Sequence, residues 1–254
     1  VDMGMFKYGS EKIHWMYKEI RSILSLFLTI LVCERKNDFK ADHIDISICV
    51  DHGKGHSCIT TILVICSQLE TGVWQEEQRT FSVANAKCKK DNSEIIKSTY
   101  GPQLNEELKA LKALGCISII LPSDGSFETA YTVIGGADAI RREADHLCFL
   151  TVPVELWMSG DILWFATALG KEGFAGWWCC YCQMFRPDWQ DEDPEATEPW
   201  TIERLTHHAN QLENGMLDVN KTNEKKGGKE KPMFEAIDTD NYANPTVHFS
   251  SGRS

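Results

Sequence analysis

The chain has no hydrophobic run long enough to cross a membrane as a helix. Its main apolar run, residues 23–33, covers about eleven residues, whereas a membrane-spanning helix needs roughly twenty. Charged side chains flank this run closely, with Glu19 and Arg21 before it and residues 34–36 after it. We therefore expect a buried helix here, with a membrane or signal segment as the alternative.

Positive charge is also scarce. The sequence holds 26 Lys and Arg residues against 37 Asp and Glu residues, so its formal net charge is −11. Because contacts to phosphate need Lys and Arg, this balance argues against the chain alone being a strong nucleic-acid binder. It does not exclude an acidic catalytic core whose carboxylates bind metal cations. The length of 254 residues and the hydrophobic fraction of 43% fit one large domain, or a domain with appendages.

A regular framework of spaced cysteines is missing too. Most of the ten cysteines lie inside apolar runs, as Cys49 and Cys66 do, which is typical of reduced, buried thiols. We infer a reducing, intracellular compartment. A complete phosphate-binding loop is likewise absent, because the glycine-containing residues 52–56 are followed by a strand pattern and not by a helix. A hairpin turn is the better interpretation of that segment.

The order of the hydrophobic patterns predicts a mixed α/β fold. Helical spacing occupies residues 1–40 and 93–114. Strand patterns occupy residues 44–50, 58–67, 79–87, 116–121 and 147–154. The first three strand patterns follow one another directly, so we expect a three-stranded meander with Asp51 in its first turn. Gly115 is a typical residue to end the second helix.

The character of the sequence changes after Cys182. A Pro-containing acidic stretch, a helical pattern over residues 202–214 and a Lys-, Gly- and Asn-rich stretch over residues 220–231 follow it. The last of these is expected to be mobile. We therefore divide the chain into an N-terminal helical segment, a core, and a C-terminal region with a cysteine knuckle, a helix and a mobile loop. These segments are residues 1–40, 41–176 and 177–254.

Two aspartates are candidate metal ligands. Asp51 follows the first strand of the meander, and Asp161 follows the last strand pattern. If both strands belong to one sheet, their carboxylates can converge and bind Mg²⁺ or Mn²⁺, which activates a water or hydroxyl group for phosphodiester cleavage or strand transfer. The alternative is that each aspartate serves only its turn, since Asp beside Gly is common in turns.

The pair Cys179 and Cys182 has the spacing of half a zinc site. The second half needs further Cys or His ligands, and His207, His208 and His248 are the downstream candidates in this chain. Two alternatives remain open, namely packed structural thiols and a redox pair. Four tryptophans near this segment are expected in the core rather than in a surface for stacking bases.

Taken together, the segment 158–182 (MSGDILWFATALGKEGFAGWWCCYC) resembles the second-aspartate region of eukaryotic cut-and-paste transposases. The likeness is to the Transib transposases and the V(D)J recombinase catalytic subunit, in which an aspartate near a strand end precedes a Cys-x-x-Cys zinc half-site. Residues 201–208, with the His207–His208 pair, and residues 231–235 resemble later elements of that family. Asp51, in the context Ile-Cys-Val-Asp-His-Gly, would be the first aspartate.

This resemblance implies an RNase H-like sheet with flanking helices and a zinc-knuckle-like insertion. In such a sheet we expect the strand of residues 44–50 to lie beside the strand that leads to Asp161. It also implies a transposable-element origin, an activity of DNA nicking and strand transfer, a nuclear location, DNA as partner and a homodimer as a compatible assembly. The family's third acid, a glutamate, and its zinc-binding histidine pair follow the element resembled by Val247 and His248, so we expect a C-terminally truncated fragment that is inactive alone. The alternative is a non-catalytic, zinc-stabilised interaction module.

Overall fold

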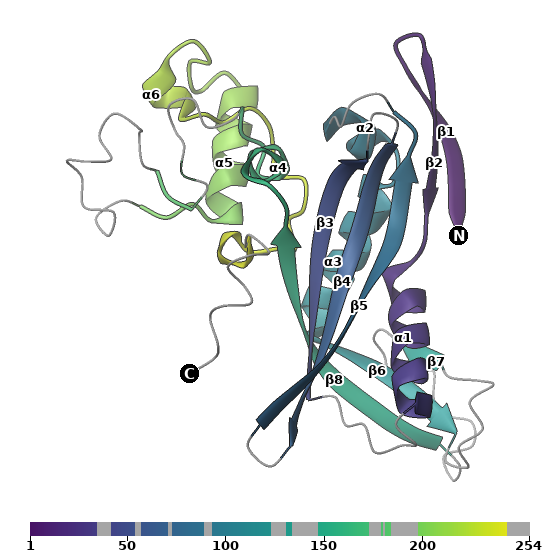
Figure 1. Cartoon of the computed structure of the whole chain (residues 1–254). Coiled ribbons are helices and arrows are strands. Elements are labelled where there is room, and N and C mark those ends of the chain that lie inside the picture. Colours follow the sequence, from purple (N-terminus) through teal and green to yellow (C-terminus); the bar gives the residue numbers. More distant parts are fainter. Residues whose placement is uncertain are drawn as a thin grey trace. The chain divides into compact units, whose positions relative to one another are not determined.

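The computed structural model, shown in Figure 1, describes residues 1–34, 42–53, 57–70, 73–88, 93–122, 131–133, 147–172, 179, 181–183 and 198–242. The chain folds as two compact units. The first unit comprises Val1–Asp91 and Ser98–Leu156, and the second comprises Asn92–Lys97 and Trp157–Ser254. The boundaries of these units differ from those of the three segments predicted from the sequence, and that division into three stays a prediction.

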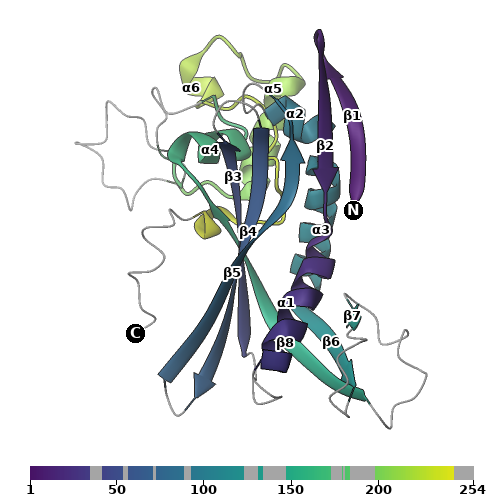
Figure 2. The same ribbon diagram turned by 45° about the vertical axis from the view of Figure 1, so that its right-hand side comes forward.

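The first unit is a mixed α/β structure built on a strongly curled sheet (Figures 1 and 2). Its strands are β1 (Asp2–Tyr8), β2 (Glu11–Tyr17), β3 (His43–Gly53), β4 (Ser57–Glu70), β5 (Val73–Ala86), β6 (Cys116–Pro122), β7 (Tyr131–Val133) and β8 (Leu147–Ser159). Across the sheet they lie in the order β1-β2-β5-β4-β3-β8-β6-β7. The mixed α/β class predicted from the sequence is therefore confirmed.

The predicted meander is confirmed as β3, β4 and β5, which pair antiparallel in sequence order. Alternation explains its stability, because Ile44, Ile46 and Ile48 are fully buried on one face of β3 while the residues between them are half-buried. The first turn, however, comes later than predicted. Asp51–Gly53 still belong to β3, and Asp51 pairs with Ile59 of β4.

The prediction of a helix over residues 1–40 is wrong for its first half. Residues 2–17 form the antiparallel hairpin of β1 and β2. The apolar residues Ile13 and Tyr17 fit a strand period as well as a helical one, and both are buried on one face of β2. Gly9, at φ 58°, supplies the left-handed residue of the turn, which fixes the hairpin.

The apolar run does form the expected buried helix, α1 (Ile20–Glu34). Leu24, Phe27 and Leu28 on one side of it are buried almost completely. Within the described part of the chain, no helix is both long and apolar enough to cross a membrane.

The predicted helix over residues 93–114 is two helices, α2 (Ser93–Ser98) and α3 (Gly101–Leu114). Pro102 lies in the first turn of α3, where its missing N–H costs nothing, whereas inside one continuous helix it would remove a hydrogen bond. The buried face of α3 is the predicted one, with Leu104, Leu108 and Leu111 fully buried. Gly115, at φ 62°, ends it as expected.

The second unit contains α4 (Ile162–Ala168), α5 (Ile202–Glu213), α6 (Thr222–Lys225) and a short 3-10 helix (Thr239–Asn241). The helix predicted over residues 202–214 is confirmed as α5. The stretch 220–231, whose mobility stays a prediction, carries α6 and is hydrogen-bonded to the segment after α4. Glu172 N donates to Gly227 O at 2.9 Å, and Lys229 N donates to Gly170 O at 2.9 Å.

Candidate functional site

The sheet order bears directly on the two predicted aspartates. β3, which carries Asp51 near its end, is the neighbour of β8, which ends just before Asp161. The prediction that the strand of residues 44–50 lies beside the strand leading to Asp161 is therefore confirmed. The Asp51 side chain lies outside the described part of the structure. The two residues belong to different compact units, so their shared site stays a prediction.

Asp161 has a defined structural role. It is the N-cap of α4, and its Oδ1 accepts a hydrogen bond from the backbone N of Trp164 at 2.7 Å. This cap satisfies one of the amide groups that a helix start leaves without a partner. The side chain is exposed, and the cap uses Oδ1, which leaves Oδ2 available to bind a cation. The residue thus fits both interpretations drawn from the sequence.

Cys179 and Cys182 form a tight turn. The backbone N of Cys182 donates to Cys179 Sγ at 3.3 Å, and both side chains are half-buried. This hydrogen bond brings the two cysteines together in a tight knuckle, as a Cys-x-x-Cys zinc half-site requires. The turn is anchored at both ends, since Cys182 pairs with Pro199 in an isolated bridge and Cys179 O accepts from Lys171. Cys180, Trp177 and Trp178 lie outside the described residues.

Lys171 was not singled out from the sequence, yet it holds this turn. Its side chain is only 4% exposed, and its Nζ donates to Cys179 O at 2.7 Å. The same ammonium group lies 5.5 Å from the centre of the Trp200 ring, in a cation–π contact. A buried lysine is costly unless its charge has partners, so this pair of contacts fixes the position of the turn. A lysine at the end of an apolar helix gives no sequence signal of such a role.

Among the described residues, the structure does not bring His207 or His208 to the cysteine pair. His207 is exposed on α5, and His208 is half-buried with its Nε2 2.8 Å from Lys225 O. The His208 ring also packs 5.8 Å from the Trp200 ring. Among the described residues, neither histidine forms a metal-sized ligand group with Cys179 and Cys182. His248 lies outside the described residues.

A cavity of about 570 Å³ in the second unit is rich in lysine and glutamate. Three of the lysines that line this cavity form ion pairs with its acids. Lys97 Nζ lies 2.8 Å from Glu230, Lys225 Nζ lies 2.5 Å from Glu172, and Lys231 Nζ lies 3.7 Å from Glu213; these are the ion pairs of the cavity wall. Because each of these three lysines already faces a carboxylate, their charges are poorly placed to bind a phosphate group.

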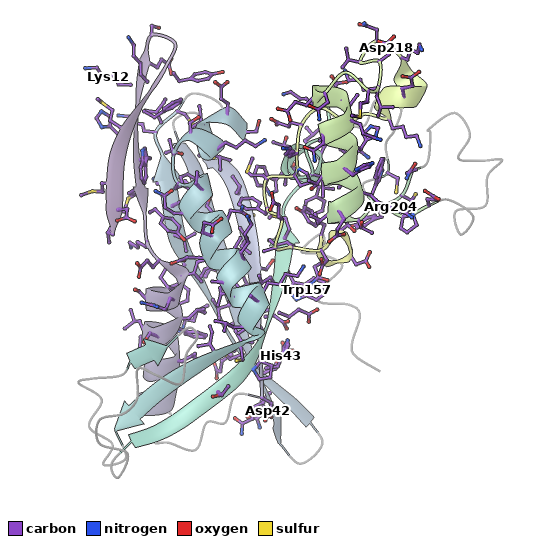
Figure 3. All side chains as sticks on the ribbon, turned by 180° about the vertical axis from the view of Figure 1, so that it is seen from behind. Lys12, Asp42, His43, Trp157, Arg204 and Asp218 are labelled. Atoms are coloured by element: carbon purple, nitrogen blue, oxygen red, sulfur yellow. The ribbon has the colours of Figure 1, made fainter. Side chains whose placement is uncertain are left out.

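Within the described part of the first unit, His43, Asp45 and Glu155 form one mixed group of ligand atoms. It lies at the start of β3, where Figure 3 labels His43. His43 Nε2 lies 2.9 Å from Asp45 Oδ1 and 3.7 Å from Glu155 Oε2. Sequence reasoning missed this group, because its members come from two strands that are far apart in the chain. The one local signal was His43 and Asp45 at strand spacing, which places both side chains on one face.

No protein-family model matches this chain, and no curated protein matches its sequence.

Proposed function

We propose that this chain is an RNase H-like transposase or nuclease core derived from a transposable element, with Asp51 and Asp161 as ligands of Mg²⁺ or Mn²⁺. The observation that carries the proposal is the adjacency of β3 and β8 in the sheet. Each of these strands leads into one of the two acids, as a shared carboxylate site requires. The fold would be an RNase H-like sheet with a zinc-knuckle-like insertion.

In this function the full-length ancestor would bind DNA in the nucleus, and a homodimer is a compatible assembly. Two acids supply only part of the ligand set of a site that needs three. The net charge of −11 also opposes encounter with DNA. We therefore propose that the chain alone is inactive, and that Cys179 and Cys182 provide half of a zinc site. The turn from Cys182 N to Cys179 Sγ supports this half-site.

Localised cleavage of the protein by bound iron tests the shared site. Fe²⁺ replaces Mg²⁺ at carboxylate sites, and with ascorbate and peroxide it cuts the polypeptide close to where it is bound. We expect cuts near residue 51 and near residue 161, both suppressed by excess Mg²⁺ and both lost in Asp51→Asn. Mass spectrometry of the fragments identifies the cuts. Cuts near residue 161 that persist in Asp51→Asn would show that the two acids do not share an ion.

A second candidate function is a non-catalytic, zinc-stabilised interaction module. The Asp161 cap favours it, because the hydrogen bond to Trp164 N explains this aspartate without a metal ion. The same iron experiment separates the two candidates. The module predicts no cut near residue 51 or 161, while zinc still binds to the cysteine pair.

A further inference from the structure

We propose that His43, Asp45 and Glu155 form a binding site for a divalent transition-metal cation, which clips β3 to β8. The site lies entirely within the first unit. It is separate from Asp51, which lies roughly 26 Å farther along β3 at about 3.3 Å per residue. It does not rest on the proposed function.

The sheet places these three side chains on one face. Ile44 and Ile46 alternate with His43 and Asp45 along β3 and are fully buried on the opposite face. On β8, Leu156 is buried next to Glu155. Because β3 and β8 are neighbours in the sheet, the two outward faces are continuous. The ligands therefore come from the backbones of two paired strands, which hold them more firmly than loops do.

The distances fit a single cation. The ligand atoms of His43, Asp45 and Glu155 all lie within 4.8 Å of one another. An ion at about 2.1 Å from each of three ligands requires ligand atoms roughly 3–4 Å apart. The exposed fractions of these side chains are 18%, 20% and 37%, so the site is partly shielded from solvent and still open to water. Water molecules would complete the coordination.

The ligand set selects the class of cation. The group offers one imidazole nitrogen and two carboxylate oxygens as ligand atoms. One nitrogen and two oxygens suit Mn²⁺ and Zn²⁺, whereas Mg²⁺ prefers oxygen ligands and keeps most of its water. The simpler interpretation is a metal-free contact between His43 and the two acids. That interpretation predicts no response of the His43 ring to a cation.

Titration with Mn²⁺, followed by NMR of the histidine ring protons, tests the proposal on the whole chain. Mn²⁺ is suited to this site and poorly suited to the Cys179–Cys182 pair. We expect the His43 signals, assigned from their loss in His43→Gln, to broaden at lower Mn²⁺ concentration than those of the exposed His14 on β2. Asp51→Asn leaves this response unchanged, which separates it from the proposed transposase site.

Two shape-conserving variants and one matched control complete the experiment. We expect Asp45→Asn and Glu155→Gln each to weaken the Mn²⁺ response of His43 about tenfold or more, since a lost ligand costs at least as much as a lost supporting contact. Asp42→Asn removes the same charge at the residue next to His43, but it removes no proposed ligand. We expect the Mn²⁺ response of His43 in this variant to stay within about twofold of that in the unmodified chain. Far-UV circular dichroism verifies that each variant is folded. If the His43 and His14 ring signals of the unmodified chain broadened at the same Mn²⁺ concentration, the proposal would be overturned. The same would follow if the His43 signals responded equally to Mn²⁺ in all variants.

Discussion

Tyr17 of β2 donates its phenolic hydrogen to Oε2 of Glu107 on α3 at 2.7 Å. The same oxygen accepts the backbone N–H of Ile20, the first residue of α1, also at 2.7 Å. One carboxylate therefore joins the N-terminal hairpin, α1 and α3 within the first unit. Burial raises the pKa of the Glu107 carboxyl above its ordinary value of 4.5, while these two hydrogen bonds act in the opposite direction.

This raised pKa gives the first prediction. Between pH 4.5 and the higher pKa of the folded state, the folded chain binds more protons than the unfolded chain. The free energy of unfolding must therefore fall as pH rises through that window. Glu107→Gln keeps an acceptor and cannot titrate, so the stability of the wild type relative to this variant should decline with rising pH. Urea unfolding at several pH values measures the difference.

Glu106→Gln is the matched control for that series, because the Glu106 side chain is 75% exposed on the same helix. The free energy of unfolding of Glu106→Gln should change with pH in the same way as that of the wild type. If Glu107→Gln and Glu106→Gln gave parallel curves, the buried carboxyl would not carry the effect.

Gly170 and Gly215 give a second prediction, since both have a positive φ, at +71° and +67°. A Cβ on Gly170 would lie 2.0 Å from Glu230 O, whereas a Cβ on Gly215 would meet nothing within 4 Å. Gly215→Ala should thus cost only the left-handed backbone, about 1–2 kcal/mol. Gly170→Ala must also displace the backbone at Glu230, so its cost in unfolding free energy should be clearly larger. Equal losses in urea unfolding would contradict the close approach.

The sequence predicted the elements whose hydrophobic period was unambiguous. Residues 44–48 of β3 alternate between apolar and polar, and α5 repeats its apolar residues at helical spacing. Each of these two patterns therefore had one interpretation. It failed for residues 2–17, because Ile13 and Tyr17 fit both periods and only pairing with β1 distinguishes them. The polar composition of residues 220–231 likewise gives no sign of the hydrogen bonds that join them to the segment after α4.

For the candidate sites too, the sequence shows the local features but not the contacts between distant segments. The strand ends and the spacing of Cys179 and Cys182 are local features, which a sequence displays directly. The adjacency of β3 and β8 followed only from the resemblance and was then confirmed by the sheet order. The approach of Glu155 to His43 depends on the twist and register of two distant strands, and a single sequence does not determine these.

Asp161 gives a third prediction, because its two roles respond differently to two substitutions. Asn retains an oxygen that caps a helix, whereas Ala does not. Asp161→Ala should therefore lower the free energy of unfolding by about 1 kcal/mol, and Asp161→Asn by much less. If the proposed metal site is present, both variants should weaken Mg²⁺ binding. Unfolding with and without Mg²⁺ separates the cap from the ligand, and equal losses of stability without Mg²⁺ would contradict the cap.

The cysteine pair gives a fourth prediction. With only half a site present, the chain should bind zinc weakly unless His207 or His208 completes the site. After dialysis against dilute zinc, the double variant Cys179→Ser, Cys182→Ser should retain much less zinc than the unmodified chain, because thiolates are the ligands that this half-site offers. Cys116→Ser is a control, since Cys116 is a half-buried thiol in β6. Elemental analysis after dialysis measures the content. Zinc that is unchanged in the double variant would exclude this pair as ligands.

The fifth prediction is that the chain alone will not nick or join DNA. The resembled site needs three acids, and the sequence supplies two in matching positions, Asp51 and Asp161. Glu235 is the nearest other candidate in an apolar setting, and it is exposed between the buried Phe234 and Ala236. Without a third acid, the second metal ion loses a ligand and the attacking oxygen loses its alignment, each of which contributes several kcal/mol to transition-state stabilisation.

A plasmid assay with Mg²⁺ or Mn²⁺ measures nicking and strand transfer, with Asp161→Ala and Glu235→Gln tested alongside the unmodified chain. We expect all three proteins to leave the plasmid supercoiled. Nicking by the unmodified chain that disappears in Asp161→Ala would show this prediction to be wrong while supporting the catalytic role of Asp161. If the same nicking also disappeared in Glu235→Gln, Glu235 would be the third acid, since an amide cannot replace a carboxylate as a ligand of the second cation.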